Sequence, residues 1–73
     1  MSAHHEYCME QALKARADAE AAPLANVRER CLRSEVAWLE MAARAERSER
    51  GRAKIAVEKA ERVAQEEAAH TNE

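Results

Sequence analysis

Three side chains close to the N-terminus, His4, His5 and Cys8, have the types and the spacing of metal ligands. On a helix, His4 and Cys8 lie one turn apart and His5 lies three residues before Cys8, so two imidazoles and a thiolate could reach one ion. A structural zinc site takes four ligands, and this segment supplies three unless a second chain completes the set. Histidines at the end of a chain are more often simply solvated. The sequence therefore predicts no resident metal, and a metal or redox sensor here is the least favoured of three functional classes.

The other thiol, Cys31, lies beside Arg28 and Arg30, and a reactive cysteine needs a positive, partly exposed setting. Cys31 also lies on an apolar helical stripe, which favours a small buried side chain over a nucleophile. The sequence contains no Ser-His-Asp order, no glycine-rich phosphate loop and no paired carboxylates for a cleft. We therefore predict that the chain is not an enzyme, with no catalytic residues, no cofactor-binding residues and no cofactor.

A basic segment, Arg44–Lys54, holds five basic residues against two acidic ones, and such a segment could follow a phosphate backbone. No aromatic side chain is interleaved with the basic ones, and most of them have a glutamate one helical turn away. A solvated helix face is therefore the favoured interpretation. A weak nucleic-acid-associated protein that uses this segment is the alternative function. The apolar side of the segment is too thin to predict a membrane partner.

Composition limits the core that this chain can build. It has 73 residues and a net charge of −2, with 36% charged residues, a balance that argues against a general binder of polyanions. Eighteen residues are alanine and none is phenylalanine, and alanine forms helices well but buries little surface. A single small domain of this kind usually needs a partner chain for stability. Two cysteines, no apolar signal region at the N-terminus and no apolar segment of membrane-spanning length predict a cytoplasmic protein.

Two helices are expected, separated by the only proline. The first is predicted over Ala3–Ala21, with Ser2 as its N-cap. Pro23 should end it, because proline disfavours the helical conformation at the preceding residue. The second helix opens either with a capping box formed by Asn26 and Glu29 or with Pro23 as its first residue.

Gly51, the only glycine, leaves two possibilities for the rest of the chain. It either caps the second helix and opens a third, or lies inside one continuous or gently kinked helix at a cost of about 1 kcal/mol. We favour the continuous helix to about Ala68, with residues 69–73 disordered. Such a helix would be about 60 Å long, so its distal half would need a second chain.

Apolar residues follow the second helix in two adjacent stripes at steps of three and four residues. The first consists of Val27, Cys31, Ser34, Trp38, Met41, Ala45 and Ser48, and the second of Leu32, Val36, Leu39 and Ala43. Together they are wider than one alanine-rich helix can cover, which predicts self-association. In an antiparallel hairpin Tyr7 should meet Trp38. The expected core or interface residues are Tyr7, Val27, Cys31, Leu32, Val36, Trp38, Leu39 and Met41.

The chain resembles short helical-hairpin proteins of alphaproteobacterial genomes. The second helix carries the pattern as Val27-Arg28, Leu32, Trp38 and Met41-Ala42, and the first half carries it as Tyr7, Ala12, Ala19 and Ala22. The similarity covers residues 7 to 46, and the segment from Arg47 onward departs from the pattern of these short proteins. It implies a helical hairpin of bacterial origin and does not imply any biochemical activity.

The sequence therefore predicts an all-α fold. An antiparallel helical hairpin occupies residues 1–50, and an extended or kinked C-terminal helical tail with a disordered end occupies residues 51–73. We expect two copies to pack as a helical-bundle dimer. The sequence does not specify whether the two chains run parallel or antiparallel. The predicted function is a non-enzymatic oligomerisation or protein-interaction module, whose partner is a second copy or another helical protein.

Overall fold

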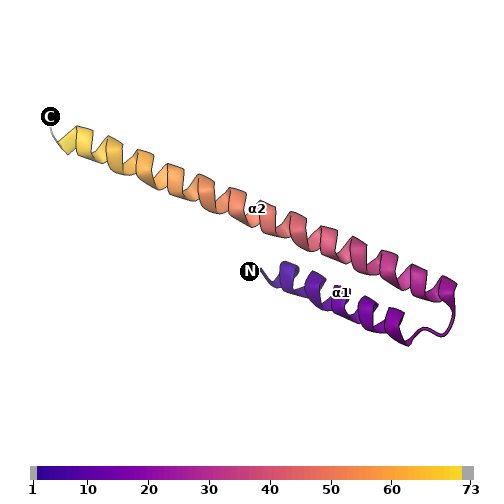
Figure 1. Ribbon diagram of the computed structural model, residues 1–73. Coiled ribbons are helices and arrows are strands. Elements are labelled where there is room, and N and C mark those ends of the chain that lie inside the picture. The colour runs from indigo at the N-terminus through magenta and orange to yellow at the C-terminus, as the bar shows by residue number, and fades with distance from the viewer. Residues whose placement is uncertain (1, 72–73) are drawn as a thin grey trace.

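The computed structural model describes residues 2–71, which form two helices joined by a short turn. Helix α1 spans Ala3–Ala21 and helix α2 spans Ala25–Thr71. The helices pack side by side in opposite directions, and no strand occurs in this part of the chain (Figure 1). The predicted all-α antiparallel hairpin is confirmed.

Helix α1 begins and ends where its sequence predicts. The Ser2 hydroxyl oxygen accepts a hydrogen bond from the backbone N–H of His5 at 3.2 Å, which satisfies one of the free donors of the first turn. At the other end Ala22 is extended, with φ −71° and ψ 125°, because Pro23 disfavours the helical region at the residue before it. Proline thus fixes both the end of α1 and the position of the turn.

The start of α2 corrects the sequence prediction. The helix begins at Ala25, and the backbone N–H of Arg28 donates to the carbonyl oxygen of Leu24 at 3.0 Å. Asn26 is therefore the second helical residue instead of the N-cap, and Pro23 lies before the helix instead of in it. Proline restricts the residue that precedes it but not the residues that follow, so the helix can resume as soon as Pro23 is passed.

Helix α2 continues through Gly51 without a break. The φ of Gly51 is not positive, so the glycine does not cap a helix there, and the continuous helix predicted for this region is confirmed. Residues 69–71 are helical as well, which corrects the disorder predicted for them; residues 72–73 lie outside the described residues. The division predicted between residues 50 and 51 falls inside α2.

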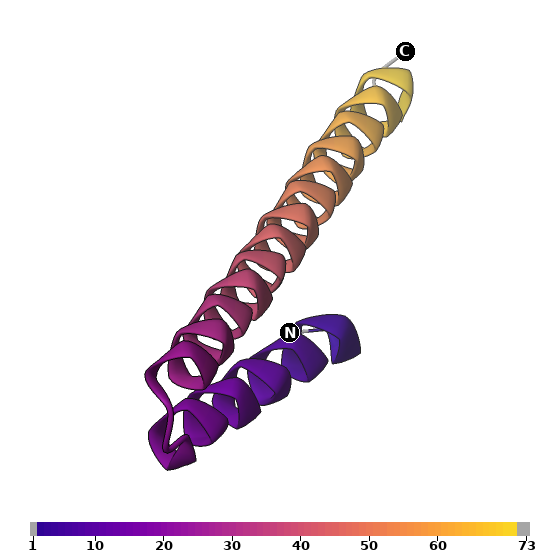
Figure 2. The ribbon, with the colours of Figure 1, turned by 90° about the vertical axis from the view of Figure 1, so that its right-hand side faces the viewer.

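Small side chains make the contact between the two helices. The buried residues of α1 are Cys8, Ala12, Ala15 and Ala19, and Ala22 is buried at its end. On α2 the buried residue is Ala42, which is 3% exposed. The distance between packed helices depends on the side chains at the contact, so this composition allows a close approach. Figure 2 shows the two helices close together at the turn and inclined to each other.

One aromatic pair fixes the register of the hairpin. The rings of Tyr7 and Trp38 meet edge to face, with centroids 5.7 Å apart and an interplanar angle of 84°. This arrangement is a favourable one for aromatic rings. The predicted Tyr7–Trp38 contact is therefore confirmed, and it places the first turn of α1 near Ala42.

Helix α1 covers only the first part of α2. It has 19 residues against 47, which corresponds to about 28 Å against about 70 Å. The molecule measures 75 × 15 × 11 Å, and beyond the N-terminus of α1 the second helix continues alone (Figure 1). All residues from Gly51 to Thr71 are exposed. Most of the stability of helices in proteins comes from packing against other elements, and this part of α2 has no such packing within residues 2–71.

Replacing Gly51 by alanine should stabilise α2 by about 1 kcal/mol, because an added Cβ meets no atom within 4 Å. The expected result is a stronger far-ultraviolet circular dichroism signal of helix and a higher melting temperature. The matched change Ala53→Gly should lower both. A loss of helical signal in Gly51→Ala would contradict a continuous α2.

Enlarging a small side chain at the contact should loosen the hairpin. Ala19 is 1% exposed, so Ala19→Leu should lower the free energy of unfolding by about 1–3 kcal/mol, measured by urea denaturation. Ala17 is exposed on the same helix, and Ala17→Leu should change it by less than about 0.5 kcal/mol. Equal effects of the two substitutions would show that α1 does not pack through its small residues.

Candidate interaction surface

The hairpin leaves several of its large apolar side chains outside the contact between the helices. Leu13 of α1 is 69% exposed, and Val36 and Leu39 of α2 are 53% and 41% exposed. Met9 is exposed as well. Single exposed apolar residues are ordinary, but a group of them on one small hairpin is typical of a surface that binds another protein.

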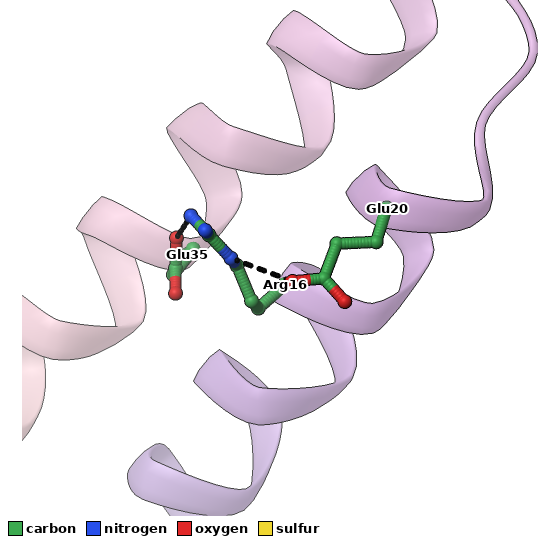
Figure 3. Close-up of polar contacts among 3 residues, drawn as sticks. All are labelled: Arg16, Glu20 and Glu35. Atoms are coloured by element: carbon green, nitrogen blue, oxygen red, sulfur yellow. Dashed lines mark hydrogen bonds and ion pairs between the residues drawn. The ribbon is translucent and has the colours of Figure 1, made fainter.

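An ion pair shows which side of α1 borders which side of α2. The Arg16 Nη1 atom lies 3.7 Å from the Glu35 Oε1 atom, and the Arg16 Nε atom lies 3.2 Å from the Glu20 Oε1 atom (Figure 3). Arg16 thus joins the two helices on one side of the hairpin. A shallow groove at the turn lies on that side, lined by Arg16, Ala19, Glu20, Arg28 and Leu32.

The exposed apolar residues lie along this same border. On α1, steps of three and four residues lead from Met9 through Leu13 to Arg16, so these residues share one side of the helix. On α2, similar steps lead from Leu32 of the groove to Val36 and on to Leu39. We call this surface the proximal face and define it by Met9, Leu13, Leu32, Val36 and Leu39. Both helices contribute to it, so it forms only when the hairpin is folded.

Polar groups surround the groove end of the proximal face. Besides the Arg16 ion pairs, the Arg28 Nη2 atom donates to the carbonyl oxygen of Ala22 at 3.4 Å, which ties α2 to the turn. Sequence reasoning missed Arg16 and Glu35, because their charges looked like those of any solvated helix face. The only available signal was their place at the edges of the apolar stripes.

The eight residues predicted as core or interface do not form one surface. Val27, Cys31, Leu32, Trp38 and Met41 are partly buried, whereas Tyr7, Val36 and Leu39 are exposed. Tyr7 lies on the edge of α1 away from Leu13, since the two are six residues apart. The Tyr7–Trp38 side and the proximal face are therefore opposite sides of the hairpin.

The side of α2 that faces α1 coincides only partly with the first predicted stripe. Most of that stripe is half-buried, but its Ser34 and Ser48 are exposed, whereas Glu35 and Glu49 are half-buried and Ala42 is buried. Ala42 lies near the start of α1. Along the rest of the contact, the small residues of α1 leave room for larger, half-buried side chains of α2, such as Cys31 and Trp38.

Of the three residues that the sequence offered as a candidate metal site, His4, His5 and Cys8, the structure brings two together. The Cys8 Sγ atom lies 3.8 Å from the His4 Nε2 atom, as expected for residues one turn apart. Cys8 is completely buried against α2, and both cysteines are free thiols. Within residues 2–71, no group of three or more His, Cys, Asp and Glu side chains is arranged to hold a metal ion.

The basic segment has polar partners within its own helix. Arg50 forms an ion pair with Glu46, and the Arg52 Nη1 atom donates to the Ser48 hydroxyl at 2.8 Å. Cys31, the other thiol that the sequence singled out, is half-buried in the first turns of α2. A shallow hollow borders the start of the basic segment and is lined by Glu40, Ala43, Arg44 and Arg47.

Comparisons with family models, curated proteins and solved structures found nothing that matches this chain. Neither helix of residues 2–71 contains a segment with both the length and the apolar character that crossing a membrane requires. The resemblance to alphaproteobacterial hairpin proteins stays a prediction. Among the described residues, the proximal face is an exposed apolar surface of the kind that contacts other proteins.

Removing the charge of Glu35 should have a small effect on stability. Arg16 is half-exposed and keeps Glu20 as a partner, so Glu35→Gln should lower the free energy of unfolding by less than about 1 kcal/mol. Urea denaturation measures this, with Glu29→Gln on the exposed side of α2 as the control. A loss above about 2 kcal/mol would mean that the ion pair, and not the small-residue contact, holds the helices together.

Proposed function

We propose that this chain is a non-enzymatic oligomerisation and protein-interaction module, in which the proximal face binds a helix of a second copy. The observation that supports this proposal most directly is the exposure of Leu13 and Val36. They belong to different helices, and each is more than half exposed on the same side of the hairpin. A helix laid along the border between α1 and α2 would contact both. Burial of apolar surface is the main driving force for such an association.

The thin core of the hairpin supports this proposal. The buried side chains are alanine and cysteine, and these contribute little apolar surface compared with leucine or valine. The larger apolar residues therefore contribute fully to stability only when another helix covers them. Small domains that lack a sufficient core commonly gain stability by oligomerisation.

We also propose that the protein is bacterial and cytoplasmic. Both cysteines are free thiols, which supports a reducing compartment and hence the cytoplasm. The similarity to hairpin proteins of alphaproteobacterial genomes supports a bacterial origin. Another helical protein that uses the same proximal face would be the alternative partner.

Two glutamates placed on the proximal face should abolish this association. Leu13→Glu combined with Val36→Glu should lower the molar mass in solution by a factor of about two at micromolar concentrations, because each association would bury charges without partners. The helical signal should stay the same, since both side chains are mostly solvated in the hairpin. Light scattering across a concentration series, with reductant present, measures the mass.

The control is Ala3→Glu combined with Ala37→Glu, one exposed residue on each helix. Ala3 lies one turn before Tyr7, on the side of α1 away from Leu13, and Ala37 lies on the side of α2 away from Leu39. This pair adds the same charge and should leave the molar mass unchanged. A wild-type chain that stays monomeric throughout, or a mass that the proximal substitutions do not change, would contradict the proposal of self-association through this face.

A further inference from the structure

The distal part of α2 has a narrow apolar side of its own. Ala53, Ala56, Ala60 and Val63 follow one another at steps of three and four residues, so they line one side of the helix. We call these four residues the distal stripe. Every residue from Gly51 to Thr71 is exposed, and this free segment is about 30 Å long.

The distal stripe continues the side of α2 that already binds α1. Ala42, the buried residue of α2, is followed seven residues later by half-buried Glu49 and four residues after that by Ala53. Because α2 is one unbroken helix, these steps keep all three residues on the same side. Its composition also matches the buried side of α1, which consists of alanine and cysteine. The distal stripe is thus the uncovered end of an existing helix–helix contact.

Charges are unevenly distributed along the same segment. Residues 44–54 carry five basic and two acidic side chains, and residues 58–67 carry four acidic and two basic ones. A parallel copy would place like charges side by side. An antiparallel copy places the basic stretch of each chain beside the acidic stretch of the other, and such complementarity selects the partner and its orientation.

We propose that the distal stripe binds the distal stripe of a second copy in antiparallel orientation. With the pair centred near Glu58, Arg50 of each chain lies level with Glu66 of the other, and Arg52 lies within one helical turn of the levels of Glu66 and Glu67. Arg50 and Arg52 border the stripe on its two sides, so their long side chains can reach across the contact. This surface is separate from the proximal face, and the proposal does not depend on it.

The length of the free segment fits this arrangement. In such a pair Thr71 of one chain lies level with about Glu46 of the other. The contact between Tyr7 and Trp38 places the start of α1 near Ala42, only about one helical turn away. The incoming helix therefore ends where α1 begins, and the two together cover one side of α2 along its whole length. The product is a rod two helices thick.

The test uses the full chain carrying Leu13→Glu and Val36→Glu, so that only the distal association contributes. Sedimentation equilibrium should show a dimer. Adding Glu66→Lys and Glu67→Lys should raise its dissociation constant at least about tenfold, because Arg50 and Arg52 of each chain then lie beside lysines of the other. Positive charge is favourable near a helix C-terminus, which offsets the like-charge pair that Glu66→Lys forms with Arg62 along the helix.

Exchanging the charges at both ends separates the two orientations. The chain that carries Arg50→Glu and Arg52→Glu in addition to the two lysines should dimerise again if the pair is antiparallel, since opposite charges again meet. A parallel pair would not recover. The control Glu58→Lys, on the side of α2 away from the stripe, should leave the dissociation constant within about twofold.

Three results would overturn the proposal: a monomeric starting chain, a dimer that is insensitive to the two lysines, or no recovery on charge exchange. Each is independent of the proximal face. If the Leu13 and Val36 substitutions leave the wild-type mass unchanged, self-association through the proximal face is wrong. The charge-exchange test of the distal stripe remains valid in that case.

Discussion

The close contact between α1 and α2 through small side chains is the constraint on which the rest of this structure depends. Cys8, Ala12, Ala15 and Ala19 form the buried side of α1. Half-buried Cys31, Glu35 and Trp38 of α2 border them, and buried Ala42 lies near the start of α1. A helix that presents such a side can approach its neighbour closely, but it cannot cover large residues of that neighbour. The chain therefore gains a defined hairpin and leaves much of its apolar surface for another molecule.

This constraint explains the distribution of the larger apolar residues. Trp38 and Tyr7 pair on one side of the contact, and Leu13 and Val36 are left largely solvated on the other. The core is too small to draw them in, and the rigid helices cannot turn them inward without losing the alanine contact. An apolar surface that both helices build follows directly from a core made of alanine.

The unequal lengths of the helices have a second consequence. Helix α2 extends beyond α1 by more than the length of α1 itself. The part of α2 beyond α1 carries small residues on the same side of the helix that contacts α1 nearer the turn. The residues that looked capable of chemistry have ordinary structural roles in this setting: Cys8 fills the contact, and Arg50 pairs with Glu46 along its own helix.

The sequence by itself determined the local features of this protein. Ser2 and Pro23 fixed the limits of α1, and the alanine-rich pattern fixed its buried side, because capping, proline sterics and helical periodicity act over a few residues. The antiparallel pairing of Tyr7 with Trp38 also followed, since a short turn leaves little freedom of register.

Only the tertiary structure decided which side of α2 faces α1. Two adjacent stripes of α2 have nearly equal apolar patterns, and the side that contains Ala42 faces α1. Packing depends on the fit of side-chain sizes as well as on hydrophobicity. The same holds for the contact of Arg16 with Glu35 and for the separation of Tyr7 from Val36. Both depend on which side of each helix faces the other, and the register set by the turn does not specify that.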